Sequence, residues 1–211
     1  MFQSIRWLSI GCGLAMTLVA GEAGATPIMT FIIDGNTFAQ PFTITNSSTG
    51  GERVTRFQLD LGTTELVFDT VNGGVPNDTL GVPFTPSGGT EATTGLIGPV
   101  VVPDGSSLLD ISFTDFDPGE FFSWDIDIDR VTGPNPQTVI GSDLIGVVAI
   151  VDFSDGQRLL GILSAVPGNS AASQFTVTGI TRTPVPEPGT LALFGIGLAG
   201  LGLLSRRANT A

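Results

Sequence analysis

Six acidic residues between positions 113 and 129 offer the clearest chemistry in this sequence. Three of them surround a Pro-Gly turn, and three follow on a stretch in which apolar and acidic residues alternate. Carboxylates at every second position of a strand lie on one face about 7 Å apart, so their repulsion favours a bound cation. Calcium takes six to eight oxygen ligands in irregular geometry. We therefore expect a calcium site formed by Asp115, Asp117, Glu120, Asp125 and Asp127.

A solvated acidic face is the alternative interpretation of the same segment. Asp125, Asp127 and Asp129 would then face water and pair with an arginine such as Arg56 or Arg130. The positions between these aspartates are apolar and are expected to face a core: Phe122, Trp124, Ile126 and Ile128. A tryptophan in such an alternation is typical of a packed interior rather than of a sugar-binding platform.

The missing residue types restrict catalysis to carboxylates. The sequence has no histidine, lysine or tyrosine, and its single cysteine, Cys12, lies near the N-terminus. Residues 26–183 therefore lack catalytic triads, thiol nucleophiles and Schiff-base lysines. A glycan-active enzyme would need a pair such as Glu120 with Asp117 or Asp125, in a cleft lined by aromatic rings. Since this region has one tryptophan and no tyrosine, we predict that the protein is not an enzyme, with a carbohydrate-binding module as the alternative.

The charge balance limits the partners. Residues 26–183 hold five arginines against 18 acidic residues, which gives a net charge near −13. Such a surface repels nucleic acid phosphates and anionic membranes. We expect no nucleic acid partner, whereas cations and neutral glycans such as exopolysaccharide remain compatible with this charge.

Residues 26–183 are expected to form one all-β domain. They show short alternating runs separated by Gly, Pro, Asn and Asp, without a helical period. Nine strands are predicted: Met29–Ile33, Phe42–Thr45, Val54–Leu61, Glu65–Asp69, Leu108–Phe113, Phe121–Ile128, Leu144–Phe153, Arg158–Leu163 and Gln174–Thr181. Short turns and no helices favour a two-sheet β-sandwich, either jelly-roll or immunoglobulin-like.

Three details refine this expectation. Residues 146–151 lack alternation and suit a central strand that is covered on both faces. Asp155 and Gly156 form a typical tight hairpin turn between two apolar runs. Residues 70–106 carry little strand signal, which is typical of a functional or irregular excursion.

Residues 1–25 have the pattern of a secretory signal peptide. Arg6 supplies the positive charge, Trp7 to Ala20 is apolar, and Ala23 and Ala25 provide the small residues for cleavage before Thr26. The apolar run spans roughly 21 Å as a helix, which is short for a permanent membrane span. A retained anchor and lipid attachment at Cys12 are the alternatives.

The C-terminal residues 184–211 read as a second targeting segment. The prolines around Val185, Pro186, Glu187 and Pro188 exclude a helix there and predict a stiff extended spacer. A glycine-rich apolar stretch follows at 190–204, and Arg206 and Arg207 close it. Paired arginines beside an apolar helix stay on the cytoplasmic side. The pattern predicts a flanking transmembrane helix with the domain outside.

These features resemble the PEP-CTERM sorting signal of Gram-negative bacteria that make extracellular polysaccharide. The resemblance covers residues 184–207 and rests on the Pro-Glu-Pro motif, the glycine-rich apolar helix and Arg206-Arg207, in that order. It implies export by the secretion machinery, transient anchoring in the inner membrane, and removal of the tail by the membrane protease exosortase. The domain would then reach the cell surface or the extracellular biofilm matrix.

Overall fold

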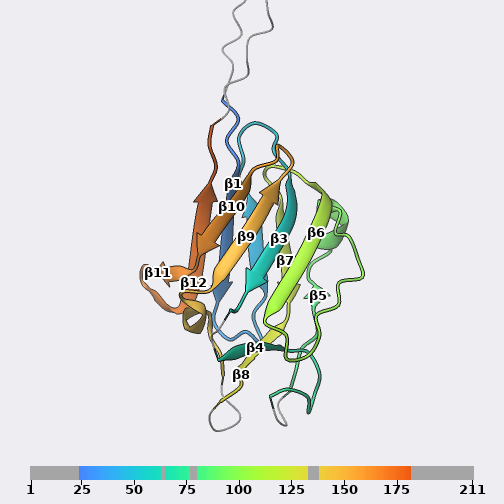
Figure 1. The fold of residues 1–211 in the computed structure, drawn as a ribbon, viewed down its shortest axis with the longest axis vertical. Coiled ribbons are helices and arrows are strands. Elements are labelled where there is room, and N and C mark those ends of the chain that lie inside the picture. Colours follow the sequence, from blue (N-terminus) through green and yellow to red (C-terminus); the bar gives the residue numbers. More distant parts are fainter. Residues whose placement is uncertain (1–23, 63–64, 77–79, 133–137, 182–211) are drawn as a thin grey trace, which may run out of the picture.

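A computed structural model describes residues 24–62, 65–76, 80–132 and 138–181 (Figure 1). Most of the predicted signal peptide, Ala23 included, and the whole sorting tail with its predicted helix lie outside the described residues. In the part that is described, no helix is long and apolar enough to cross a membrane.

Antiparallel strands in three sheets form the framework of the domain. The six-stranded sheet has the order β11 (Ser164–Val166), β12 (Asn169–Thr178), β1 (Ile28–Asp34), β2 (Phe42–Asn46), β7 (Phe121–Asp125) and β5 (Thr85–Pro86). The four-stranded sheet has the order β10 (Arg158–Ile162), β9 (Val148–Phe153), β3 (Val54–Asp60) and β6 (Leu108–Phe116). A two-stranded sheet pairs β4 (Leu66–Asp69) with β8 (Asp127–Arg130).

Aromatic rings join the two larger sheets across the core. Phe57 of β3 lies 5.4 Å from Phe31 of β1 and 5.8 Å from Trp124 of β7, measured between ring centroids. All three side chains are fully buried. Large rings bury the most apolar surface per residue and dominate the stability of such a core. The predicted burial of Trp124 is confirmed.

The alternation of apolar and polar residues predicted the strands well. On β3, Phe57 and Leu59 are buried whereas Arg56 and Gln58 are partly exposed, as expected. Residues Asp155 and Gly156 lie in the turn that joins β9 to β10, where Gly156 has a φ of +84°. The all-β expectation is therefore confirmed for the described domain.

Three expectations about the secondary structure were wrong. The domain has a short helix, α1 (Thr90–Thr94), and a 3-10 helix at Gly141–Leu144, where no helix was expected. Strand β9 alternates between half-buried and buried residues because its outer face is not covered. The strand predicted over Phe121–Ile128 is interrupted at Ile126 and continues in a different sheet as β8.

The two ends of the domain meet at one pole. The hydroxyls of Thr26 and Thr181 lie 2.8 Å apart, and β1 pairs with β12 from Ile28↔Thr178 to Asp34↔Ala172. The β4–β8 sheet lies at the opposite end of the molecule (Figure 1). Both predicted targeting segments therefore connect to the same pole, which we call the terminal pole, while β4 and β8 form the far pole.

Candidate functional site

Three aspartates converge at the far pole. Asp69 ends β4 and lies directly opposite Asp127, the first residue of β8, and Asp129 follows two positions later on the same strand. One carboxylate oxygen from each residue lies within 4.8 Å of the other two. The exposed fractions are 0% for Asp69, 3% for Asp127 and 8% for Asp129. We call these three residues the aspartate cluster; it is the only such group of acidic residues in the described parts of the chain.

Loop residues close over the aspartate cluster. Asp127 Oδ1 accepts hydrogen bonds from Thr37 Oγ1 at 3.2 Å and from the Ile128 amide at 2.8 Å. The Asp127 amide donates to Val82 O at 3.1 Å, and the Val82 amide donates to Asp69 O at 3.0 Å. The loop approaches so closely that a Cβ at Gly81 would lie 2.3 Å from Asp69 Oδ1. Only a glycine fits there, and its presence lets the backbone cover the carboxylates.

The electrostatics of the aspartate cluster favour an added positive charge. Burial raises the pKa of Asp127 to about 7, and the negative charges of Asp129 and Asp69 add to the rise, against the hydrogen bonds from Thr37 and Ile128. Desolvation and like charges both disfavour a carboxylate, so three of them together need a proton or a cation. Oxygen ligands of this kind suit a hard divalent cation such as calcium.

A fourth carboxylate lies beside the cluster and stays ionised. Burial opposes the ionisation of Asp104, but hydrogen bonds from the Thr70 and Val75 amides, at 2.9 and 2.7 Å, outweigh it and lower its pKa. The Asp104 side chain also interacts with Asp69. Its negative charge makes the electrostatic potential at this pole more negative, which favours a bound cation.

The structure separates the residues of the predicted calcium site. Asp115 and Asp117 lie at the terminal pole, 3.4 and 3.8 Å from Arg53 nitrogens, and Glu120 accepts a hydrogen bond from the Asp117 amide at 2.8 Å. Asp125 ends β7 and accepts a hydrogen bond from Ser87 Oγ at 2.6 Å. Asp115, Asp117 and Glu120 do not join Asp127 in the aspartate cluster, because the β6–β7 turn and the β4–β8 sheet lie at opposite ends. Asp125 is only two residues from Asp127 in the chain, but it is not among the carboxylates that converge there.

The alternative of a solvated acidic face fits only part of the segment. Asp115 and Asp117 are exposed and pair with an arginine, as this interpretation requires. That arginine is Arg53 and neither of the two that were expected. Asp127 and Asp129 are buried. The two arginines that were expected to pair with the segment bind other partners, as Arg56 pairs with Asp110 and Arg130 with Asp143.

Asp69 was not among the ligands predicted from the sequence, because its partners are distant in the chain. The predicted strand that ends at Asp69 already placed this acidic residue at a strand end. Only the β4–β8 register, with Asp69↔Asp127 and Val67↔Asp129, shows which acidic residues it meets. Asp129 was recognised in the alternation but was not included in the predicted ligand set.

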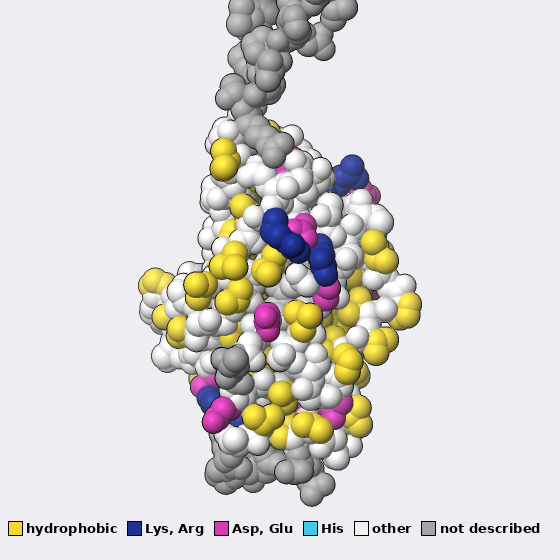
Figure 2. Space-filling model, in the orientation of Figure 1, with side chains coloured by type: hydrophobic (Ala, Val, Ile, Leu, Met, Phe, Trp, Pro, Cys, Tyr) yellow, Lys and Arg dark blue, Asp and Glu magenta, His cyan; other side chains and the backbone are white. Residues whose placement is uncertain are grey.

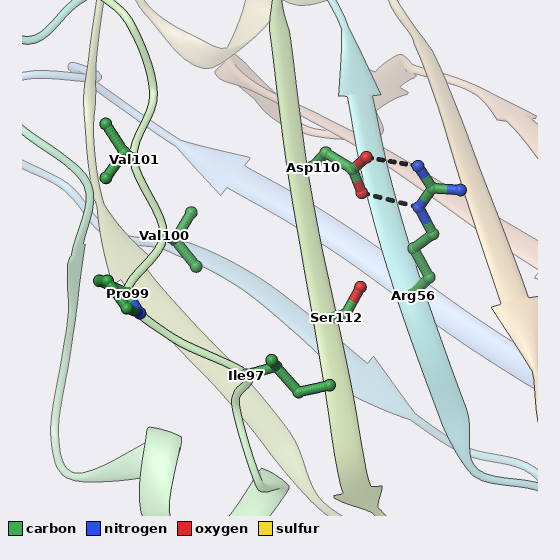
Figure 3. A pocket seen from close by; sticks show the side chains of 7 residues that line it. All are labelled: Arg56, Ile97, Pro99, Val100, Val101, Asp110 and Ser112. Carbon is green, nitrogen blue, oxygen red and sulfur yellow. Dashed lines mark hydrogen bonds and ion pairs between the residues drawn. The ribbon is translucent and has the colours of Figure 1, made fainter.

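Described residues also line two surface pockets. The first, about 490 Å³, lies where the loop 97–101 meets the outer face of the four-stranded sheet (Figure 3). Asp110 of β6 and Arg56 of β3 point toward each other on its wall, and the loop supplies aliphatic side chains. The Arg56 guanidinium lowers the pKa of Asp110 by hydrogen bonding, so the pair is fully ionised. Figure 2 shows this face, on which arginine and acidic side chains lie together among apolar ones.

The second pocket, about 330 Å³, lies beside the β6–β7 turn. Its lining combines the half-exposed ring of Phe121, the Glu120 carboxylate and the hydroxyl-bearing residues Thr90 and Thr93, with glycines between them. A ring next to hydrogen-bonding oxygens is a combination that can hold a sugar.

The described domain is thus an acidic, antiparallel β domain, with both ends at one pole and buried carboxylates at the other. Beyond it, residues 184–207 match the model of the PEP-CTERM protein-sorting motif. The chain therefore carries the predicted sorting signal, which marks an exported protein that is processed by exosortase. No curated protein and no solved structure matches the chain.

Proposed function

We propose that this chain is a non-catalytic protein of the cell envelope or extracellular matrix, whose working part is the acidic β domain. The observation that carries the proposal is the PEP-CTERM motif at residues 184–207. In this proposal the secretion machinery exports the chain, the tail anchors it transiently in the inner membrane, and exosortase releases it for delivery to the surface.

The placement of the domain ends supports this route. Thr26 and Thr181 are in hydrogen-bond contact, so a membrane that holds both targeting segments would face the terminal pole. The far pole, with the aspartate cluster, would then point away from the membrane. A domain with this arrangement can fold and keep its far pole away from the membrane while its tail is still anchored.

The geometry of the carboxylates supports a non-catalytic role. Two-carboxylate glycan hydrolysis needs an acid and a base that flank an open cleft, about 5 to 9 Å apart. Glu120 instead binds the backbone of Asp117, and Asp125 binds Ser87. The carboxylates that do converge, those of the aspartate cluster, are buried beneath the residue 81–82 loop rather than facing a cleft.

Replacement of Pro186, Glu187 and Pro188 by alanine tests the sorting step. We expect the triple variant to keep its tail and to stay in the inner-membrane fraction, whereas the natural chain loses the tail. Intact mass spectrometry of fractionated host cells measures both. Thr183→Ala, just outside the matched motif, serves as the control and should be processed normally. Unchanged processing and location of the triple variant would refute the sorting proposal.

Calcium binding is a second candidate function, favoured by the convergence of three buried carboxylates at the far pole. Asp69, Asp127 and Asp129 would supply the protein ligands, of which only Asp127 belongs to the site predicted from the sequence. A cation there would replace the proton that Asp127 binds because burial raises its pKa. Calcium titration of the purified protein, with chelator as the reverse step, tests this function.

Glycan binding is the alternative that the pocket beside Phe121 favours. The neutral hydroxyls of an exopolysaccharide could bind the Glu120 and Thr93 oxygens while a sugar ring stacks on Phe121. A glycan array with the natural protein and with Phe121→Ala measures this directly. Equal binding by both proteins would exclude this pocket.

A further inference from the structure

Glu52 is a buried acidic side chain with one oxygen that lacks a partner. It lies in the loop between β2 and β3 and is 4% exposed. Its Oε2 accepts a hydrogen bond from the Gly50 amide at 3.0 Å, but Oε1 accepts none from any described residue. Burial of a carboxylate without full hydrogen bonding or a counter-charge costs folding free energy. A cationic hydrogen-bond donor beside Glu52 would remove this cost.

The residue that covers Glu52 belongs to the predicted signal peptide. A Cβ at Gly50 would lie 2.5 Å from Ala25 Cα and 2.8 Å from Glu52 Oε1, so Ala25 and this oxygen approach the same point. The next residue is fixed to the same loop, since the Thr26 amide donates to Thr49 Oγ1 at 3.2 Å and the Thr49 amide donates to Thr26 O at 3.1 Å. The predicted cleavage bond, Ala25–Thr26, is therefore held next to the Glu52 carboxylate.

Signal cleavage changes the chemistry of the Thr26 nitrogen. Hydrolysis adds one water across the Ala25–Thr26 peptide bond, so that the new carboxylate leaves with Ala25 and the new amine stays on Thr26. The amide nitrogen has one N–H, which Thr49 already accepts. The protonated amine has three N–H donors and a positive charge.

We propose that the α-ammonium group of Thr26, released by signal cleavage, is the missing partner of Glu52 and binds its Oε1. Removal of the signal peptide then completes the fold of the exported domain. The proposal rests on cleavage before Thr26 and is independent of how the C-terminal tail is processed.

No other described cation is available to Glu52. Each of the four described arginines already pairs with an aspartate. The neighbouring Arg53 points toward the β6–β7 turn, where its Nη1 approaches Asp115 and the carbonyl oxygen of Thr114.

Among the described residues, the other charged groups at the terminal pole are acidic, apart from Arg53 and Arg158, and Arg158 pairs with Asp152. Asp115 and Asp117 bind Arg53, Glu120 binds the Asp117 amide, and Asp155 binds Gln157. They add negative potential around Thr26, which favours an ammonium group there. Their hydrogen bonds leave Glu52 as the acidic group beside the cleavage site.

The absence of lysine makes the test specific, because the α-amino group is the only primary amine of the processed chain. Reductive methylation of the full processed protein with ¹³C-formaldehyde labels that amine alone, and NMR then follows its titration. An ordinary α-amino group has a pKa of about 7.7 to 8.0. We expect a pKa about one unit higher in the natural protein, and a return to the ordinary range in Glu52→Gln.

Asp60→Asn, an exposed carboxylate at the opposite end of β3, is the matched control and should leave the raised pKa unchanged. The same pKa in the natural protein and in Glu52→Gln would overturn the proposal. A mature mass that starts at a residue other than Thr26 would also overturn it.

Acetylation of the amine gives a second readout that does not depend on the titration. It should lower the melting temperature of the natural protein below pH 8 and leave that of Glu52→Gln unchanged. Because the folded-state pKa of the amine is raised, the stabilisation is full below the unfolded pKa and is lost as the pH rises through the folded value. Equal effects of acetylation on both proteins would contradict the pairing.

Discussion

Asp69 and Asp127 lie directly opposite each other across the β4–β8 pair, and both carboxylates are almost completely buried. Neighbouring strands bring opposed side chains within about 5 Å, where like charges destabilise the pair. With Asp129 close by, three acidic side chains converge in the interior of the described domain.

The stability of the domain should fall between pH 4 and pH 7 in the presence of chelator. The pKa of Asp127 rises from 3.8 to about 7 on folding, so the folded state binds the proton more tightly. The resulting stabilisation is full below the unfolded pKa and is lost as the pH rises through about 7, up to about 4 kcal/mol in all. Urea unfolding at several pH values measures it. Asp127→Asn should flatten the profile, and an unchanged profile would show that another group is responsible.

Calcium should offset that loss at pH 7.5. Binding to the folded state alone adds roughly 2.7 kcal/mol at a concentration 100 times the dissociation constant. We expect a higher melting temperature with calcium in the natural protein and none of this gain in Asp69→Asn. Asp117→Asn, an exposed aspartate at the terminal pole, should keep the gain. If calcium shifts neither protein, a proton alone neutralises the aspartate cluster.

Gly81→Ala should destabilise the far pole by about 1 to 3 kcal/mol, because its methyl group would lie 2.3 Å from Asp69 Oδ1 and 2.6 Å from the Val71 nitrogen. Gly98→Ala is the control, since the nearest atom to its methyl group would be 3.9 Å away. Chemical denaturation of both variants decides the point. Equal stability of the two would mean that the loop moves away without cost.

Phe57→Ala should destabilise the domain by about 3 to 5 kcal/mol, since this ring contacts both Phe31 and Trp124 across the sheets. Phe121→Ala removes the same ring from a half-exposed position and should change the stability far less. Thermal unfolding followed by tryptophan fluorescence, which reports on Trp124, compares them. Similar losses in both variants would argue against a core shared by the two sheets.

The sequence allowed the strands to be predicted better than the site. Alternation at Phe57 and Leu59 reflects burial within one strand, so it is visible locally. The aspartate cluster depends on a sheet change at Ile126 and on the pairing of Asp69 with Asp127, which lie far apart in the chain. Nothing in the local pattern reveals that both faces of β8 are covered. The short helix at Thr90–Thr94 was missed because five residues are too few to show a helical period.

The pairing of β1 with β12, next to the contact between Thr26 and Thr181, affects how the domain would bear a mechanical force. If the tail is anchored as proposed, tension enters at Thr181 and acts along β12, which is paired with β1 over the whole length of β1. A force along the strand axis pulls in shear on all hydrogen bonds between β1 and β12 at once, instead of breaking them one after another. The strand next to the tail is thus suited to resist drag on an anchored domain until the tail is cut.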